Sequence, residues 1–381
     1  MDGWIAQAEL GPSNSKLFLK LSILLPHSRY HTATTMQLTL GVVSSALVSL
    51  TAAASSWLSL DSALASQPDL SIFRSLLKQF DILDRAHSAK DSTIIAPNDD
   101  AYRALAKWGF NVSEVPAEVA RALLTYHVLN GVHNSKSIQS SEDHRIAHTH
   151  LTPPVLTNVT EGAAVKLYAV DRTIMTESGL GVLGGVVGDE TSYDHGVIHT
   201  LNSSMVLPHN ISVTAELSGV TSFLDAMESN DMVSTLEGQK DVTLFVPVNE
   251  AMDKLEPALK LLSENQMAAV LANHAVPGKV LYHNKLEEQT VKSLQGSELA
   301  IATGVGGTKL VNGAKIVRED IIIYGGVMHL VDAVLTLEHG KLSSSGPARY
   351  YLLISQQTRL RTSRAMCLLR PSLGSAALLL R

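Results

Sequence analysis

The sequence lacks residues that several functional classes require. It has one cysteine, Cys367, in 381 residues, which excludes a disulfide within the chain and any site that needs several cysteines to hold zinc or an iron–sulfur cluster. Basic residues are not in excess, because 30 Lys and Arg stand against 36 Asp and Glu, and nucleic acid is therefore not an expected partner. Hydrophobic residues nevertheless make up 45% of the chain, enough for about two domains with cores of their own.

Familiar catalytic motifs are also missing. The sequence contains no Gly-x-Ser-x-Gly elbow, no His-Glu-x-x-His and no phosphate-binding loop. Residues 179–184 match the glycine spacing of a dinucleotide site, but no helix signal follows, so this segment is predicted to be a flexible hairpin or loop. We expect no enzyme activity and no cofactor.

The two ends differ from the middle of the chain. Residues 36–54, MQLTLGVVSSALVSLTAAA, are uncharged and end in small residues, as a secretory signal beginning at Met36 would. Residues 1–35 would then be a non-native or disordered extension; an uncleaved membrane anchor and a buried core helix are the alternatives for 36–54. Residues 339–381 are rich in Ser and Arg and are predicted to be a disordered tail, with contact to anionic surfaces as the alternative.

The middle of the chain contains an internal repeat. Three blocks recur in the same order, and the unit of roughly 130–150 residues has the size of a whole domain rather than of a solenoid repeat. The paired blocks are 93–102 with 243–252, 124–131 with 271–278, and 196–202 with 326–332. The sequence therefore predicts two copies of one domain.

Each block predicts local structure. The runs Thr93–Ala96 and Thr243–Val246 are predicted to be buried strands ended by proline, and Asn98 and Asn249 are predicted to cap the helices that follow. Helices are expected before each strand. The second block should be a helix closed by Asn130-Gly131, and the third a strand after a glycine turn.

These blocks resemble those of the fasciclin (FAS1, βig-h3) domain family. The first block is similar to its first box, Tyr126-His127 to its tyrosine-histidine motif, and residues 196–208 and 326–337 to its closing box. The resemblance implies two domains at 68–208 and 212–338. It implies an α+β fold, each domain a β-wedge of mainly antiparallel strands flanked by helices.

The resemblance also implies a function. The family usually acts in extracellular adhesion or interaction without catalysis, through an extracellular protein or a cell-wall or matrix component. Tyr126 and His127 are the interaction candidates that it implies, with a buried structural role for His127 as the alternative. The second copy departs from the motif, because Asn273 stands where the first has Tyr126.

Glycosylation sequons support entry into the secretory pathway. Four triplets fit the acceptor pattern: Asn111, Asn158, Asn202 and Asn210. Together with residues 36–54, they predict a secreted or cell-surface glycoprotein.

Histidines are the remaining candidates for chemistry. His195 and His199 have the spacing of a metal pair on a helix, but the intervening Gly196 predicts a turn and a strand, which would separate them. His199 is predicted to bond the backbone at the edge of the core. Residues 142–150 hold three histidines and two carboxylates; a solvated loop is expected there, and a metal-dependent activity is the alternative.

A second function comes from the resemblance to fungal fasciclin proteins. Some accompany a multicopper oxidase of the laccase type in the oxidative coupling of aromatic polyketides to pigments or toxins. The chain would then be an accessory that holds the oxidase or its aromatic substrate without a metal of its own.

Overall fold

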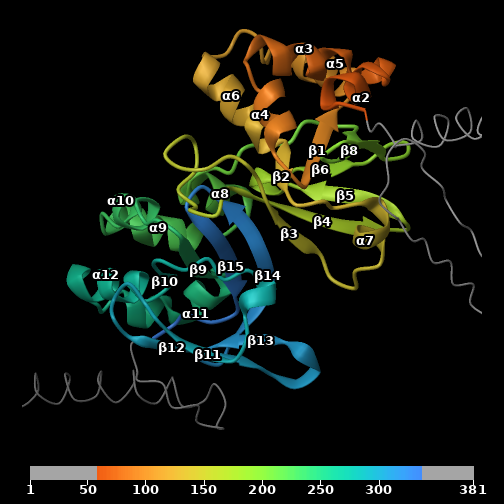
Figure 1. The fold of residues 1–381 in the computed structure, drawn as a ribbon. Coiled ribbons are helices and arrows are strands. Elements are labelled where there is room, and N and C mark those ends of the chain that lie inside the picture. Colours follow the sequence, from red (N-terminus) through yellow and green to blue (C-terminus); the bar gives the residue numbers. More distant parts are fainter. Residues whose placement is uncertain (1–57, 337–381) are drawn as a thin grey trace, which may run out of the picture. The chain divides into compact units, whose positions relative to one another are not determined.

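The computed structural model describes residues 58–336, and these contain two copies of one α+β domain (Figure 1). The extension at 1–35, the signal-like segment at 36–54 and the tail at 339–381 lie outside the described residues, as does Cys367. Among the helices of residues 58–336, none has the length and apolar character needed to cross a membrane.

The first domain opens with helices, as predicted. Its helices are α2 (Leu60–Ala65), α3 (Ser71–Gln79), α4 (Leu83–Ser88), α5 (Asp99–Lys107), α6 (Ala117–Tyr126) and α7 (Ser135–Gln139). Its strands are β1 (Ser92–Pro97), β2 (Val128–Asn130), β3 (Arg145–His148), β4 (Ala164–Val170), β5 (Thr173–Glu177), β6 (Leu183–Gly185), β7 (Thr191–Tyr193) and β8 (Gly196–Leu201). They form two sheets, ordered β2-β1-β8-β7 and β3-β4-β5-β6.

The second domain repeats this order with fewer elements. Its helices are α8 (Ile211–Leu217), α9 (Thr221–Ser229), α10 (Val233–Glu237), α11 (Asn249–Leu259) and α12 (Glu264–Ala272). Its strands are β9 (Val242–Pro247), β10 (Ala275–Val276), β11 (Gln289–Lys292), β12 (Glu298–Thr303), β13 (Lys309–Val311), β14 (Ala314–Ile323) and β15 (Gly326–Val331). They form one sheet, ordered β10-β9-β15-β14-β13-β12-β11.

Each domain is built on a central parallel pair within otherwise antiparallel sheets. Strand β1 pairs with β8 in parallel, and β9 with β15 in the same way. A Cβ atom at Gly196 would lie 1.7 Å from the carbonyl oxygen of Ser92, and one at Gly326 would lie 1.9 Å from that of Val242. The repeated glycine therefore allows the two central strands to approach at their first residues.

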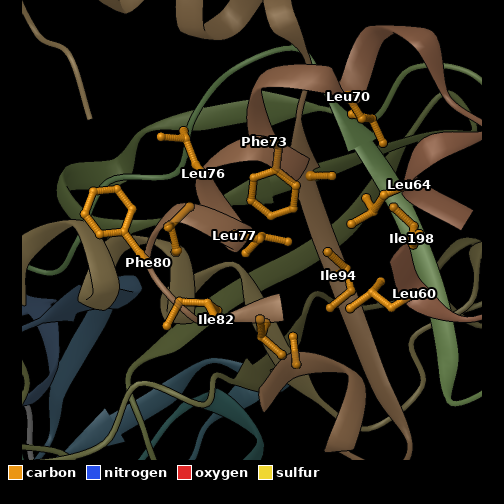
Figure 2. Packing of buried hydrophobic residues seen from close by; sticks show 14 of the residues in the cluster. Leu60, Leu64, Leu70, Phe73, Leu76, Leu77, Phe80, Ile82, Ile94 and Ile198 are labelled. Atoms are coloured by element: carbon orange, nitrogen blue, oxygen red, sulfur yellow. The ribbon is translucent and has the colours of Figure 1, made fainter. Parts of the chain in front are cut away.

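The central strands are buried on both faces, which explains why they are apolar without alternation. In β1, Ile94 and Ala96 point into a core formed with the helices, while Ile95 points into a second core beneath the other sheet. Figure 2 shows Phe73 and Leu77 of α3 packed with Ile94 and with Ile198 of β8. The second domain repeats this division, with Leu244 and Val246 on one side and Phe245 on the other.

One predicted helix cap is confirmed and the other is wrong. The Asn98 Oδ1 accepts from the Ala101 N–H at 2.8 Å, as an N-cap does. In the second domain the cap position of α11 is Val248, and Asn249 is already helical. The Asn249 Oδ1 instead accepts from the Ser222 N–H at 3.1 Å, at the start of α9, because the sequence equivalent of Asn98 is Val248.

Asn249 occupies the position of Asp99, which has the same task in the first domain. The two carboxylate oxygens of Asp99 accept from the Ser71 hydroxyl at 2.7 Å and the Ile72 N–H at 2.9 Å, at the start of α3. Asp99 and Asn249 thus accept hydrogen bonds at the start of a neighbouring helix, not of the helix to which they belong.

One further expectation needs correction. Helix α6 ends at Tyr126, and Asn130 is the last residue of strand β2, so Asn130-Gly131 does not close the helix; Gly131 has φ 84°. The hairpin expected at 179–184 is present, because a short 3-10 turn leads into strand β6, which pairs antiparallel with β5. This segment is packed, since a Cβ atom at Gly179 would lie 2.3 Å from the Leu207 carbonyl oxygen.

Candidate functional site

The predicted interaction residues Tyr126 and His127 lie wholly inside the first domain. Both are 0% exposed. The Tyr126 hydroxyl donates to the Ala164 carbonyl at 2.7 Å, and Tyr126 packs in the core beneath the second sheet. In this conformation neither side chain is accessible to a partner, and the geometry of His127 agrees with the structural alternative.

His127 joins the end of α6 to the segment after β8. Its Nδ1 donates to the Leu123 carbonyl at 2.7 Å, and its Nε2 accepts from the Met205 N–H at 3.2 Å. His274 repeats the arrangement, with Nδ1 to the Val270 carbonyl at 2.8 Å and the Leu335 N–H to Nε2 at 2.9 Å. One nitrogen donates and the other accepts, so each ring is a neutral imidazole of fixed tautomer.

Burial lowers the pKa of His127 and of His274 to about 4, against the weaker opposing effect of the carbonyl that each ring contacts. Both rings are therefore neutral at pH 7 and have their two nitrogens engaged. An imidazole in this state cannot shuttle a proton to a ligand, which assigns the pair to the architecture of the fold.

The histidines of the closing block are also interior. The prediction for His199 is confirmed: it is 0% exposed, and its Nε2 donates to the His133 carbonyl at 2.7 Å. In the second domain the His329 Nε2 donates to the Leu281 carbonyl at 2.8 Å. Burial lowers the pKa of both imidazoles.

The ligand-rich stretch at 142–150 does not converge on one point. Glu142 and Asp143 are exposed, whereas His148 contacts the Gly162 carbonyl at 3.0 Å and the Glu161 carboxylate at 3.2 Å. The side chain of His144 contacts neither His148 nor Glu161 but a residue of the second domain. The stretch by itself therefore offers no common ligand centre.

His144 instead meets two residues of the second domain. Its Nε2 and the His283 Nδ1 each donate to the same Asp320 Oδ2 at 2.6 Å, and the two ring centroids are 3.9 Å apart. Asp320 is 0% exposed, and its Oδ1 accepts from the His283 N–H at 2.9 Å. Sequence reasoning missed this group because its members come from distant parts of the chain with no shared motif.

Hydrogen bonds within this group shift the pKa values of Asp320 and His283. Burial by itself would raise the pKa of Asp320, but the hydrogen bonds from His144 and His283 outweigh it and hold the pKa well below the usual range of a carboxyl group. The hydrogen bond to Asp320 in turn raises the pKa of His283. The group is an internal hydrogen-bond network between residues of the two domains.

Two aromatic side chains close together in the sequence are exposed in the first domain. Trp108 is 89% exposed at the end of α5, and Phe110, two residues later, is 39% exposed. Gly109 between them has φ 79°, a conformation that favours glycine and turns the chain at this point. The signal in the sequence was a Trp-Gly-Phe triplet directly before the sequon at Asn111.

The predicted glycosylation sites differ in accessibility. Asn111, Asn202 and Asn210 are exposed, whereas Asn158 is half-buried. The Asn158 Nδ2 donates to the Gln239 carbonyl at 3.0 Å, in a part-buried contact with the second repeat. The structure therefore favours the first three as acceptors.

Comparison with known proteins identifies the repeated domain. The family model for the fasciclin domain matches residues 68–208 and 218–337, more than half of the chain. The chain belongs to the fasciclin family. The structured copies begin slightly before each match, because α2 starts at Leu60 and α8 at Ile211.

Two fungal relatives cover most of this fasciclin-domain protein. A fasciclin-like arabinogalactan protein, elcF of Phaeosphaeria nodorum, is 48% identical over 304 residues, which are 80% of this chain and 95% of the relative. Another, CTB11 of Cercospora beticola, is 41% identical over 295 residues, 76% of this chain and 79% of the relative. Among solved structures, a FAS1 domain pair from the insect cell adhesion molecule fasciclin I is 18% identical, with a TM-score of 0.35, over 70% of this chain and 97% of that pair.

Proposed function

We propose that this fasciclin-domain protein is a secreted or cell-surface glycoprotein that acts by binding an extracellular protein or a cell-wall component, without catalysis. The observation that carries the proposal is the exposed pair Trp108 and Phe110. Tryptophan is enriched among residues that anchor interfaces, since it buries a large apolar area at a small loss of conformational freedom. Exposure of 89% leaves the Trp108 ring available to a partner.

The state of the core histidines supports a role in binding over one in turnover. His127, His199, His274 and His329 are all 0% exposed, and each bonds the backbone. Burial lowers the pKa of each of these four imidazoles. The histidines that the two domains share thus serve the fold.

The test measures binding of the purified full chain to isolated cell walls and to separated extracellular proteins. We expect Trp108→Ala to weaken binding at least tenfold without lowering the thermal unfolding temperature. The matched control is Val305→Ala, which removes an apolar side chain that is 100% exposed in the second domain. Equal binding by the Trp108→Ala variant and the unmodified protein would refute the assignment of this surface.

A second candidate function uses the same surface for a different partner. Exposed aromatic rings can stack on an aromatic polyketide, so the protein would present such a substrate to a laccase-type multicopper oxidase. The experiment adds the full chain to the oxidase and a phenolic polyketide and measures the coupled products. A changed product distribution that Trp108→Ala abolishes favours this candidate, whereas unchanged products with intact cell-wall binding favour the first.

A further inference from the structure

A second group of potential ligands lies wholly in the first domain. One ligand atom from each of His87, Asp194 and His195 lies within 4.8 Å of the other two. His87 is in the last turn of α4, and Asp194 and His195 form the turn between β7 and β8. The sequence drew attention to His195 as a partner of His199, but the fold places it beside His87, with ring centroids 5.4 Å apart.

Two of these atoms are buried and have no hydrogen-bond partner among the described residues. They are the His87 Nδ1 and the Asp194 Oδ1, which lie 3.6 Å apart. A buried polar atom without a partner is uncommon, because it loses its hydrogen bonds to water and gains none in return. The two atoms form an ion pair if His87 is protonated, whereas a cation between them would engage both atoms with His87 neutral.

The 3.6 Å separation suits a shared metal ion. Nitrogen and oxygen ligands bound at about 2.0–2.2 Å around a tetrahedral ion lie roughly 3.3–3.6 Å from each other. The His144, His283 and Asp320 group differs in this respect. There the nitrogen–oxygen distances are 2.6 Å and every contact is a hydrogen bond, so no space for an ion remains between them.

Backbone hydrogen bonds hold the turn that carries Asp194 and His195. The Ser92 N–H donates to the His195 carbonyl at 3.0 Å, and the Asp194 N–H donates to the Leu58 carbonyl at 2.9 Å. Gly196, directly after His195, begins the parallel pairing of β8 with β1. The ligand-bearing turn is thus held by the central sheet.

A hollow of about 310 Å³ opens next to the group. Asp194 and His195 line it, together with Lys90, Asp91 and Tyr193. Two of the three proposed ligands thus border an open space, which leaves a fourth position for water or an exogenous ligand, the arrangement that distinguishes reactive zinc sites from closed structural ones.

The second copy of the domain lacks this group. Its residues at the positions of His87, Asp194 and His195 are Glu237, Tyr324 and Gly325. The strand registers give this correspondence, since Ser92 pairs with Gly196 in β8 and Val242 pairs with Gly326 in β15. The fold therefore forms without these ligands, and scaffold requirements do not account for their presence in the first copy.

We propose that His87, Asp194 and His195 bind one divalent first-row transition-metal ion, with Zn²⁺ as the expected occupant. Two imidazoles and one carboxylate are a donor set that Zn²⁺ favours, and its tetrahedral geometry needs one further ligand from the hollow. The site extends the proposed binding function, which does not depend on it.

The test titrates the full chain, stripped with a chelator, with Zn²⁺ by calorimetry and with Co²⁺ by visible absorption. We expect binding of one ion and the absorption bands of four-coordinate Co²⁺. Asp194→Asn and His195→Gln should each weaken the affinity at least tenfold. His195→Gly is a further variant that should also weaken the affinity. It introduces the glycine that the second copy carries at this position, and the second copy forms the same fold.

The control is His283→Gln, which alters the other histidine–carboxylate group and should leave the affinity unchanged. Thermal unfolding of every metal-free variant establishes that it is folded. No binding of Zn²⁺ or Co²⁺ below about 1 mM by the unmodified protein would overturn the proposal. So would undiminished affinity in folded Asp194→Asn and His195→Gln variants, or a loss of affinity confined to His283→Gln.

Discussion

At the scale of single residues, repeated histidines serve the interior of this protein. His127 and His274 recur at equivalent positions because each bonds a helix carbonyl through one nitrogen and the returning chain through the other. Repetition of a polar residue in both copies here reflects a buried hydrogen-bond requirement of the fold. The residues with potential to bind are those that the copies do not share, Trp108 and the group around His195.

Replacing either His127 or His274 should destabilise the protein. His127→Ala removes the side-chain partner of the Leu123 carbonyl and of the Met205 N–H, and His274→Ala removes the partner of the Leu335 N–H and one of two partners of the Val270 carbonyl. We expect each substitution to cost about 2–4 kcal/mol of unfolding free energy. Chemical denaturation monitored by circular dichroism measures this loss. The control is His209→Ala at an exposed position, which should change the free energy by less than about 0.5 kcal/mol.

The same two histidines predict a pH dependence of stability. Their pKa is about 4 in the folded protein, and an unfolded imidazole titrates near 6.5, so between these values the unfolded chain binds more protons. Their contribution is present above pH 6.5 and is lost as the pH falls toward 4. Each should reduce the free energy of unfolding by up to about 1.4 kcal/mol per pH unit in that window.

Denaturation at pH 7, 6 and 5 checks this, together with the imidazole signals of His127 and His274 in NMR spectra. The His127→Ala variant should show a shallower loss of stability over this range, because it lacks one of the titrating groups. A His127 ring that protonates near pH 6.5 in the folded protein would contradict the burial argument.

At the scale of elements, helices of each domain are capped by residues from other helices. Asp99 and Asn249 are the first residues of α5 and α11, yet their side chains accept hydrogen bonds at the starts of α3 and α9. The pair therefore fixes two helices relative to each other, which a cap within one helix does not do. Sequence reasoning assigned the cap of α11 to Asn249 because it considered only the helix that follows.

Removal of this cross-helix cap should be measurable. Asp99→Ala leaves the Ile72 N–H and the Ser71 hydroxyl without their acceptor, and we expect a loss of about 1–2 kcal/mol in unfolding free energy. The neighbouring Asp100→Ala is the matched control, because the side chain of Asp100 is 84% exposed and pairs with an exposed Arg103. Equal effects of the two substitutions would show that Asp99 does not cap α3.

At the scale of the whole molecule, the two domains share one fold but differ in the length of one connection between strands. Residues 149–163 link β3 to β4, whereas the equivalent connection in the second domain is only residues 293–297. From this longer segment, Asn158 donates to the carbonyls of Tyr324 and Gln239, and the Thr160 N–H donates to Asp241. The longer connection of the first repeat thus forms hydrogen bonds with the second repeat.

The network around Asp320 should show energetic coupling between the two repeats. His144 and His283 donate to the same oxygen, so loss of one changes the environment of the other. We expect His144→Ala and His283→Ala each to lower the free energy of unfolding, and their effects in the double variant to depart from additivity by about 1–2 kcal/mol.

Denaturant unfolding of the four proteins of this cycle gives the coupling. The comparison cycle pairs His148→Ala with His283→Ala, since His148 instead contacts an exposed Glu161 carboxylate. Strict additivity of His144→Ala and His283→Ala would mean that Asp320 does not connect the two side chains.

Much of this organisation was predictable from sequence, and the exceptions have physical causes. Strands β1 and β9, the helices before them and the repeat itself follow from apolar patterns that local chain geometry dictates. The Asn98 cap was predictable because cap and helix are adjacent in sequence. The target of Asn249, the burial of Tyr126 and the packed turn at Gly179 were not, since each depends on a segment that returns from elsewhere in the chain.

The sequence by itself determined that this chain holds two copies of one domain, because three blocks recur in the same order, and the resemblance of these blocks indicated the fasciclin family. It also excluded a disulfide within the chain and any site that needs several cysteines. Only the tertiary structure decided which polar residues meet. It moved Tyr126 and His127 into the core, separated His144 from His148, and brought His87 to His195, because proximity of side chains depends on how the sheets and helices pack rather than on their order along the chain.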